Sequence, residues 1–183
     1  KVYFSNEGTN YLVKDVDDLV AGDVYIVQGQ SNAAALSYSG SSNSYLNEYL
    51  RVYSGGYTSS SSLINDDQWY YAQGDGNENS GGNAGQWGLA LAKMIKDEFN
   101  IPIAIFNGAH GGQPIVFFDR PNNYNSSTDS NYGRMYHRLN ETGLRNSVRA
   151  VLWSQGEADS FSNGLSTQQY KGSFENLMSY WQE

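Results

Sequence analysis

Residues 22–32 read Gly22-Asp23-Val24-Tyr25-Ile26-Val27-Gln28-Gly29-Gln30-Ser31-Asn32. The apolar run Val24–Val27 stands between two glycines, which is typical of a β-strand that is buried on both faces of a parallel sheet. The polar residues that follow turn directly into Ala33–Leu36, which is a good start for a helix. This stretch therefore predicts a strand, a tight turn and a helix, with Ser31 where the helix begins.

The same alternation continues along the chain. Two further buried strands are predicted, at Ile101–Phe106 and Ala150–Trp153. Apolar residues recur with helical spacing in three segments, at 84–99, 132–147 and 166–181. Alternating strands and helices predict an α/β fold, in which a mainly parallel sheet carries helices on both faces.

Two segments fall outside this alternation. Residues 1–20 contain two short strand-like pieces and are predicted to be the end of a preceding β element or a linker. The domain itself then covers residues 21–183. It includes a Ser-, Gly- and Tyr-rich insertion at about 37–83, whose first part, to residue 65, is predicted to be a long surface excursion. Within this insertion, a short strand at Arg51–Tyr53 is an alternative to a continuous loop.

The composition excludes some kinds of chemical site and argues against some kinds of binding partner. The chain has 183 residues, with 11 Lys+Arg against 19 Asp+Glu, a net charge of −8 and no Cys. This length fits one domain. Without Cys there is no disulfide, thiol nucleophile or thiolate metal site. The negative charge argues against nucleic acid or an anionic membrane as the main partner, and no apolar run approaches the ~20 residues of a membrane span.

Small polar and aromatic residues dominate the remaining composition. The chain is rich in Ser, Asn and Gly, whereas charged residues make up only 16% and aromatic residues 14%. Hydroxyls, amides and rings suit contact with sugars, but a secreted protein with Tyr- and Asn-rich loops would have the same composition. On this basis we expect a secreted, periplasmic or cell-surface location.

Three polar loops follow the three predicted strands: Gly29–Asn32, Asn107–Gly112 and Gln155–Asp159. The carboxyl ends of parallel strands meet at one edge of the sheet, and α/β proteins bind ligands there. We therefore expect the three loops to form one crevice.

The residue types in these loops suit ester hydrolysis. A hydroxyl at a helix N-terminus, as predicted for Ser31, can be a nucleophile, although a simple N-cap is the alternative. The amide of Gln155 and the N–H of Gly112 are donors of the kind that stabilise an oxyanion, or plain loop and turn groups. A serine nucleophile needs a base. His110 is one candidate, whereas His137 lies in a predicted helix and is assigned to packing or the surface.

The quoted stretch, with its Gly-Gln-Ser-Asn, resembles the first block of the SGNH/GDSL hydrolases. Within that superfamily it is similar to the sialate O-acetylesterases and related carbohydrate acetylesterases. Residues 153–159, Trp153-Ser154-Gln155-Gly156-Glu157-Ala158-Asp159, are similar to that branch's Trp-x-Gln-Gly-Glu-x-Asp block. Gly111–Ile115 resembles its Gly-Gly-Thr-x-Ile segment, with Gln113 in place of Thr.

The resemblance covers roughly residues 20–36 and 84–183 and implies a three-layer α/β/α, flavodoxin-like fold. It implies an O-acetylesterase for an acetylated carbohydrate substrate, without metal or cofactor. Ser31 would be the nucleophile, and the N–H groups of Ser31 and Gly112 with the side chain of Gln155 would form the oxyanion hole. Substrate contacts are assigned to neighbouring loop residues: Gln30, Asn32, His110 and Glu157.

One block of the family is not found in this sequence. The family's Asp-x-x-His supplies the base and its orienting Asp, and it occurs nowhere in the 183 residues. In the family it follows the helix with which this sequence ends, so we expect the base beyond Glu183. A degenerate, inactive protein and His110 as the base are the alternatives.

Two other functions compete with the acetylesterase. One is a non-catalytic carbohydrate-binding or interaction domain on the same scaffold. The other is an SGNH hydrolase of lipid or aryl esters, which the polar, Tyr-rich loops disfavour. The sequence names neither the sugar, nor the acetylated position, nor the oligomeric state.

Overall fold

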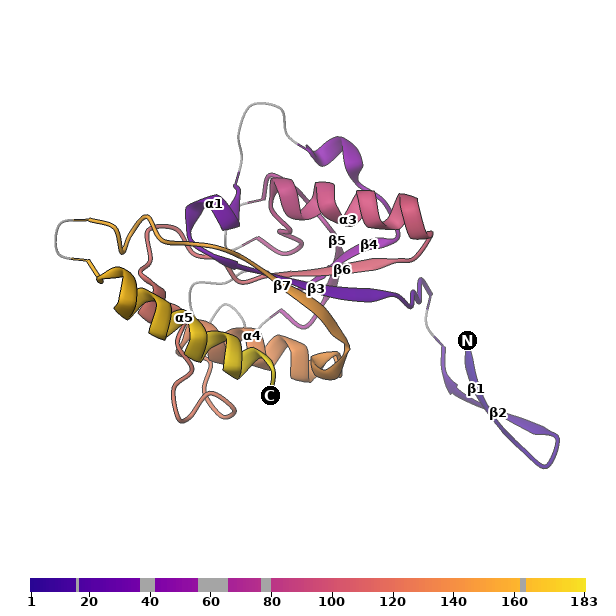
Figure 1. The fold of residues 1–183 in the computed structure, drawn as a ribbon. Helices are drawn as coiled ribbons and strands as arrows, with labels where there is room; N and C mark the ends of the chain where they lie inside the picture. Colours follow the sequence, from indigo (N-terminus) through magenta and orange to yellow (C-terminus); the bar gives the residue numbers. More distant parts are fainter. Residues whose placement is uncertain (16, 37–41, 56–65, 77–79, 162–163) are drawn as a thin grey trace.

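The computed structural model describes residues 1–15, 17–36, 42–55, 66–76, 80–161 and 164–183. Its body is a five-stranded sheet in the order β5-β4-β6-β3-β7 (Figure 1). β5 is antiparallel to β4, and the other four strands are parallel. The prediction of a mainly parallel sheet is therefore confirmed. The strands are β3 (Asp23–Gly29), β4 (Leu50–Tyr53), β5 (Trp69–Tyr71), β6 (Ile103–Asn107) and β7 (Val148–Ser154).

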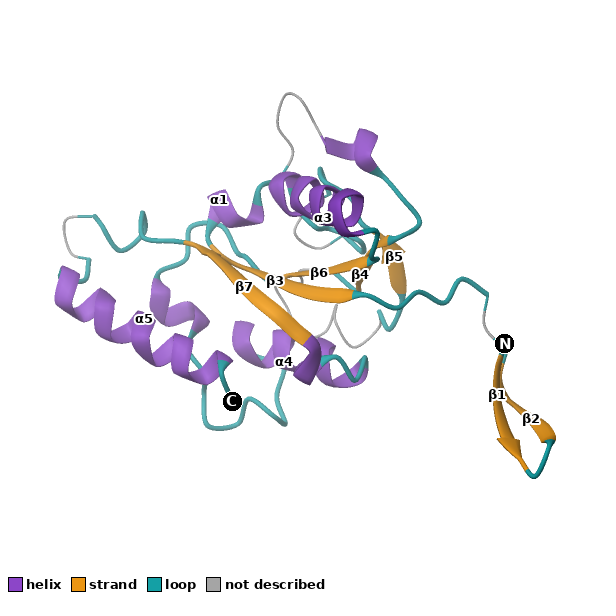
Figure 2. Ribbon diagram, turned by 45° about the vertical axis from the view of Figure 1, so that its right-hand side comes forward, coloured by secondary structure: helices purple, strands orange, loops and turns teal. Residues whose placement is uncertain are grey.

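Helices cover both faces of the sheet, which makes three layers (Figures 1 and 2). One face carries α1 (Ser31–Ala34) and α3 (Gln86–Phe99), and the other carries α4 (Asn131–Glu141) and α5 (Thr167–Trp181). A capping box of Ser166 and Gln169 starts α5. α4 ends earlier than predicted, because Gly143 takes a positive φ of 68° that leaves the helical region. The described residues also form the 3-10 turns η1 (Ser42–Tyr45), η2 (Ile115–Phe118) and η3 (Arg145–Ser147).

Both faces of β3 are buried, which explains its continuous apolar run. Successive side chains of a strand point to opposite faces. Val27 therefore packs with Leu89 in the core beneath α3, whereas Ile26 packs with Met135 and Leu139 in the core beneath α4.

Strand β4 corrects the prediction for the insertion at about 37–83. It lies between β5 and β6, and Leu50 and Val52 are fully buried. The surface excursion predicted up to residue 65 is therefore wrong for this strand. Only four residues make up the strand and Arg51 interrupts them, so the apolar signal was weak. Residues 37–41, 56–65 and 77–79 of the insertion lie outside the described residues.

A pair of leucine variants tests this placement of β4. Leu50→Ala is expected to lower the free energy of unfolding by about 2 kcal/mol or more, because it leaves a cavity in the core. Leu46→Ala is the matched control, since Leu46 is 51% exposed and should change stability by less than about 0.5 kcal/mol. Urea unfolding measures both, and equal effects would contradict an interior strand.

The first residues form a unit of their own. β1 (Val2–Asn6) and β2 (Thr9–Lys14) pair as an antiparallel hairpin that stands away from the body in Figures 1 and 2. Its apolar side chains are exposed, with Phe4 at 59%. That residues 1–20 end a preceding β element stays a prediction.

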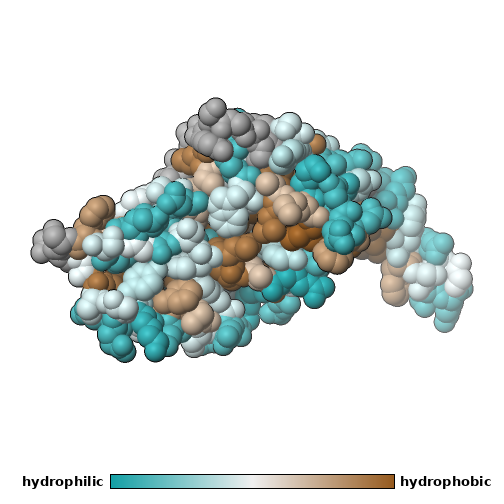
Figure 3. Space-filling view, turned by 45° about the horizontal axis from the view of Figure 1, so that its top comes forward, coloured by the Kyte–Doolittle hydropathy of each residue, from teal (hydrophilic) through white to brown (hydrophobic). Residues whose placement is uncertain are grey.

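One face of the body is largely polar. On the face drawn in Figure 3, hydrophilic residues dominate and hydrophobic ones form small separate groups. Among the residues placed by the structure, no helix is both long and apolar enough to cross a membrane.

Candidate active site

The strand order brings the three polar loops side by side. β3 lies between β6 and β7, so the loop after β3 is flanked by the loops after the other two strands. Backbone hydrogen bonds join them: the N–H of His110 donates to Gly29 O at 2.9 Å, and the N–H of Gln30 donates to Ser154 O at 3.0 Å. Residues from three distant parts of the sequence thus form one edge of the sheet.

Ser31 is the first residue of α1, and its side chain is exposed. The turn before it requires Gly29, whose φ is +129° and where a Cβ would lie 2.0 Å from Ser154 O. Gln30, not Ser31, occupies the N-cap position, and it makes no side-chain capping hydrogen bond. The alternative that Ser31 merely caps the helix is therefore wrong.

No histidine in the described part of the chain pairs with Ser31. The Ser31 Oγ makes no hydrogen bond to any described residue, His110 included. The ring of His110 instead packs on Phe117, with centroids 5.0 Å apart. His137 lies half-buried on α4, as the sequence predicted. The structure thus offers no support for His110 as the base of Ser31.

The side chain of Gln155 connects all three loops. Its Nε2 donates to Asp159 Oδ2 at 2.6 Å, to the carbonyl of Gln113 at 3.1 Å and to Gln30 Oε1 at 3.2 Å. Its Oε1 is buried and has no partner among the described residues. The carboxamide is therefore held with its nitrogen toward Asp159. Its role as an oxyanion donor stays a prediction.

Two buried side chains hold this arrangement. Gln30 is 4% exposed, and its Oε1 also accepts the N–H of Ala158 at 3.0 Å. Asp159 is 6% exposed, and its Oδ2 also accepts the N–H of Ile115 at 2.8 Å. Gln30 was predicted to contact substrate, but its side chain is buried between the loops. The sequence reasoning did not assign a role to Asp159, although its place four residues after Gln155 in the same block was a usable signal.

The remaining predicted residues lie at the surface of the loops. Asn32 Nδ2 donates to Glu157 Oε1, so the first and last motifs meet. The carbonyl of Asn32 accepts the indole N–H of Trp87 at 2.9 Å. Gly112 is exposed at a φ of +72°, and a Cβ there would meet no atom within 4 Å. Its backbone is therefore open to approach, as an oxyanion donor requires.

Tyr170 supports the third loop from α5. Its hydroxyl donates to the carbonyl of Gln155 at 3.0 Å and accepts from the indole of Trp153 at 3.3 Å. Burial raises the pKa of Tyr170 above its ordinary value. The phenol therefore remains a hydrogen-bond donor at neutral and moderately alkaline pH.

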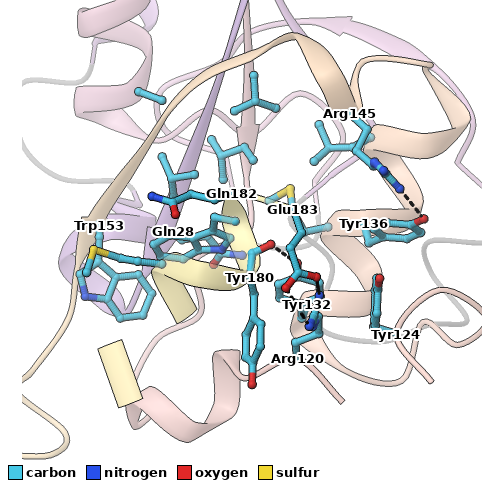
Figure 4. A pocket seen from close by; sticks show the side chains of 18 of the residues that line it. Gln28, Arg120, Tyr124, Tyr132, Tyr136, Arg145, Trp153, Tyr180, Gln182 and Glu183 are labelled. Atoms are coloured by element: carbon cyan, nitrogen blue, oxygen red, sulfur yellow. Dashed lines mark hydrogen bonds and ion pairs between the residues drawn. The ribbon is translucent and has the colours of Figure 1, made fainter. Parts of the chain in front are cut away.

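A separate cavity lies on the face of the sheet that carries α4 and α5. It has a volume of about 820 Å³, and Arg120, Tyr132, Trp153 and Tyr180 are among the residues that line it (Figure 4). The Arg120 guanidinium stacks 4.1 Å from the centre of the Tyr180 ring. None of the predicted site residues lines this cavity.

The described residues do not form a typical metal-binding site. Within the described residues, no group of three or more His, Asp or Glu side chains is arranged to hold an ion.

Comparisons with known proteins agree with this fold. A protein from Arabidopsis thaliana superimposes with a TM-score of 0.62 at 21% identity, over 88% of this chain and 68% of that one. A carbohydrate acetylesterase from Xanthomonas citri superimposes with a TM-score of 0.60 at 20% identity, over 88% of this chain and 38% of that one. At these identities the likeness shows the fold, and the chain spans well under half of the Xanthomonas protein.

Sequence comparison gives the family. No curated protein matches the sequence significantly. Residues 21–183, which include all three loops, match the family described as carbohydrate esterases, sialic acid-specific acetylesterases. The chain therefore belongs to the sialic acid-specific acetylesterase family of carbohydrate esterases.

Proposed function

We propose that the protein removes O-acetyl groups from sugars, with Ser31 as the nucleophile. The observation that carries this proposal is the exposed Ser31 hydroxyl at a strand-to-helix turn, flanked by loops from both neighbouring strands. Membership of a carbohydrate esterase family supports the same reaction. Polar loop residues such as Asn32 and Glu157 suit a hydroxyl-rich substrate better than a long acyl chain.

The reaction proceeds through an acetyl-enzyme. Ser31 Oγ attacks the acetyl carbonyl carbon while its proton passes to a base. The N–H groups of Ser31 and Gly112 and one N–H of Gln155 stabilise the oxyanion of the tetrahedral intermediate. The C–O bond to the sugar then breaks, and the sugar oxygen takes the proton from the base. Water attacks the acetyl-enzyme with the same base, and acetate leaves.

The base in this proposal comes from an Asp-x-x-His block outside the 183 residues. Two observations support it. The Ser31 Oγ has no histidine partner among the described residues, and the chain covers only 68% and 38% of the two structural neighbours.

The pH profile distinguishes the two possible bases. For the full-length protein we expect kcat/KM to fall below a pKa near ~6.5, because a His base works only in its neutral form. The isolated 183-residue segment should lack this acidic limb. If the segment shows the limb and His110→Asn removes it, then His110 is the base.

The test of the function is acetate release by the full-length protein. An enzymatic acetate assay with O-acetylated sialic acid, acetylated xylo-oligosaccharides and p-nitrophenyl acetate identifies the substrate class. p-Nitrophenyl palmitate is the matched control for a lipid esterase. No acetate from any acetylated substrate would contradict the proposal, and faster hydrolysis of the palmitate would favour a lipid esterase.

A further inference from the structure

We infer that Asp159 is a positioning residue that holds the Gln155 carboxamide in the orientation needed to stabilise the oxyanion. The inference rests on the proposed function, because it concerns the same reaction. Asp159 does not act on the substrate itself but through Gln155 and through the loop that carries Gly112.

The contacts of Asp159 are those of a buried carboxylate held by N–H donors. One oxygen, Oδ2, accepts both the Gln155 Nε2 at 2.6 Å and the Ile115 N–H at 2.8 Å. In the described part of the chain, no Lys or Arg forms an ion pair with it. A buried charge is costly unless it is hydrogen-bonded. The N–H groups of Gln155 and Ile115 therefore hold the Asp159 carboxylate in place, and the carboxylate in turn holds these two N–H groups in place.

The unpartnered oxygen of Gln155 shows that its orientation is imposed. The Gln155 Oε1 is buried without a hydrogen bond to any described residue, and leaving such an acceptor unsatisfied is unfavourable. Rotating the amide by 180° would instead place Oε1 against the carboxylate oxygen of Asp159, where two acceptors repel. Asp159 thus keeps the nitrogen of the Gln155 amide, and not its oxygen, directed toward the carboxylate.

The hydrogen bonds made by the two side-chain N–H groups of Gln155 differ in strength. The contact to Asp159 is short and charge-assisted, which makes it the strong one. The contacts to Gln30 and to the Gln113 carbonyl, at 3.2 and 3.1 Å, are longer and share the other hydrogen. That second N–H can therefore exchange its weak acceptors for a developing oxyanion, while the first keeps the amide in place.

The same carboxylate also restrains the second oxyanion donor. The backbone N–H of Ile115 donates a hydrogen bond to Asp159, and Ile115 lies only three residues after Gly112 in the chain. Gln30 completes the link to the loop that carries Ser31. Because misplacement of about 1 Å can cost a hundredfold in rate, one side chain that holds both donors has a large effect on kcat.

Two substitutions of Asp159 in the full-length protein test the inference. Asp159→Ala removes the acceptor and is expected to lower kcat roughly ten- to hundredfold while KM changes less than about threefold. Asp159→Asn retains an oxygen that can take the place of Oδ2, and it should recover most of the loss. Glu175→Ala removes an exposed carboxylate from α5 and should leave kcat unchanged.

A double-mutant comparison shows whether Asp159 acts through Gln155. In a Gln155→Ala background, Asp159→Ala should lower kcat by a much smaller factor than in the wild type, because the effects of coupled residues do not add. Equal factors in both backgrounds, or a kcat of Asp159→Ala within twofold of an active wild type, would overturn the inference.

A measurement independent of turnover separates this inference from the proposed function. The side-chain amide signals of Gln155, assigned by their loss in Gln155→Ala, should shift in NMR spectra of Asp159→Ala and move less in Asp159→Asn. Unmoved signals would overturn the inference even if the enzyme is active. A wild type that releases no acetate would count against the proposed function, whether or not these signals shift.

Discussion

Ser31→Ala is expected to abolish acetate release, with kcat/KM reduced by more than about 10⁴-fold. In the proposed mechanism the substitution removes the atom that attacks the acetyl carbon of the substrate, and loss of a serine nucleophile costs about this much or more in a well-studied protease. Stability should not change, because the Ser31 hydroxyl is exposed and makes no hydrogen bond to a described residue. Acetate release and thermal unfolding of the full-length variant measure the two quantities.

Ser179→Ala is the matched control for this experiment. Ser179 is an exposed serine on α5, so its loss should leave turnover unchanged. Turnover of Ser31→Ala equal to that of the wild type would remove Ser31 as the nucleophile.

Gln155→Ala is expected to lower kcat roughly a hundredfold or more, with a smaller effect on KM. An oxyanion donor acts mainly in the transition state, and removing one costs ~2.7–4 kcal/mol of barrier. Some loss of stability is expected as well, because Asp159 and Gln30 lose a shared donor inside the protein. Steady-state kinetics on an acetylated sugar, together with thermal unfolding, separate these two effects.

Gln168→Ala is the matched control, since Gln168 is an exposed glutamine on α5. It should change neither kcat nor KM. A rise in KM alone for Gln155→Ala would mean that Gln155 binds substrate and does not stabilise the transition state.

Local sequence patterns were sufficient to predict the frame of the fold. The apolar runs of β3 and β6 are continuous because these strands lie inside the sheet and are buried. β7, which was also predicted to be a buried strand, is instead the edge strand of the sheet and is only partly buried. The helical spacing of α3 and the capping box of α5 are equally local signals. Parallel strands then place their following loops at one edge. For this reason the sequence was enough to predict that Ser31 and Gln155 lie at the same edge of the sheet.

Other features depended on neighbours that no local pattern records. β4 is interior only because β5 and β6 flank it, and α1 ends after four residues because Ala35 takes a left-handed backbone conformation. Likewise, the burial of Gln30 follows from contacts with residues of the loop after β7, which is distant in the sequence.

The sequence by itself determined the kinds of chemical groups in the three loops and the positions along the chain of the strands that carry them. Only the tertiary structure decided which groups touch, and it alone showed Asp159 bonded to Gln155 and to Ile115, 44 residues earlier. Periodicity reports burial within one element. A hydrogen bond between loops depends instead on strand order and on the direction of each side chain, which exist only once the sheet has formed.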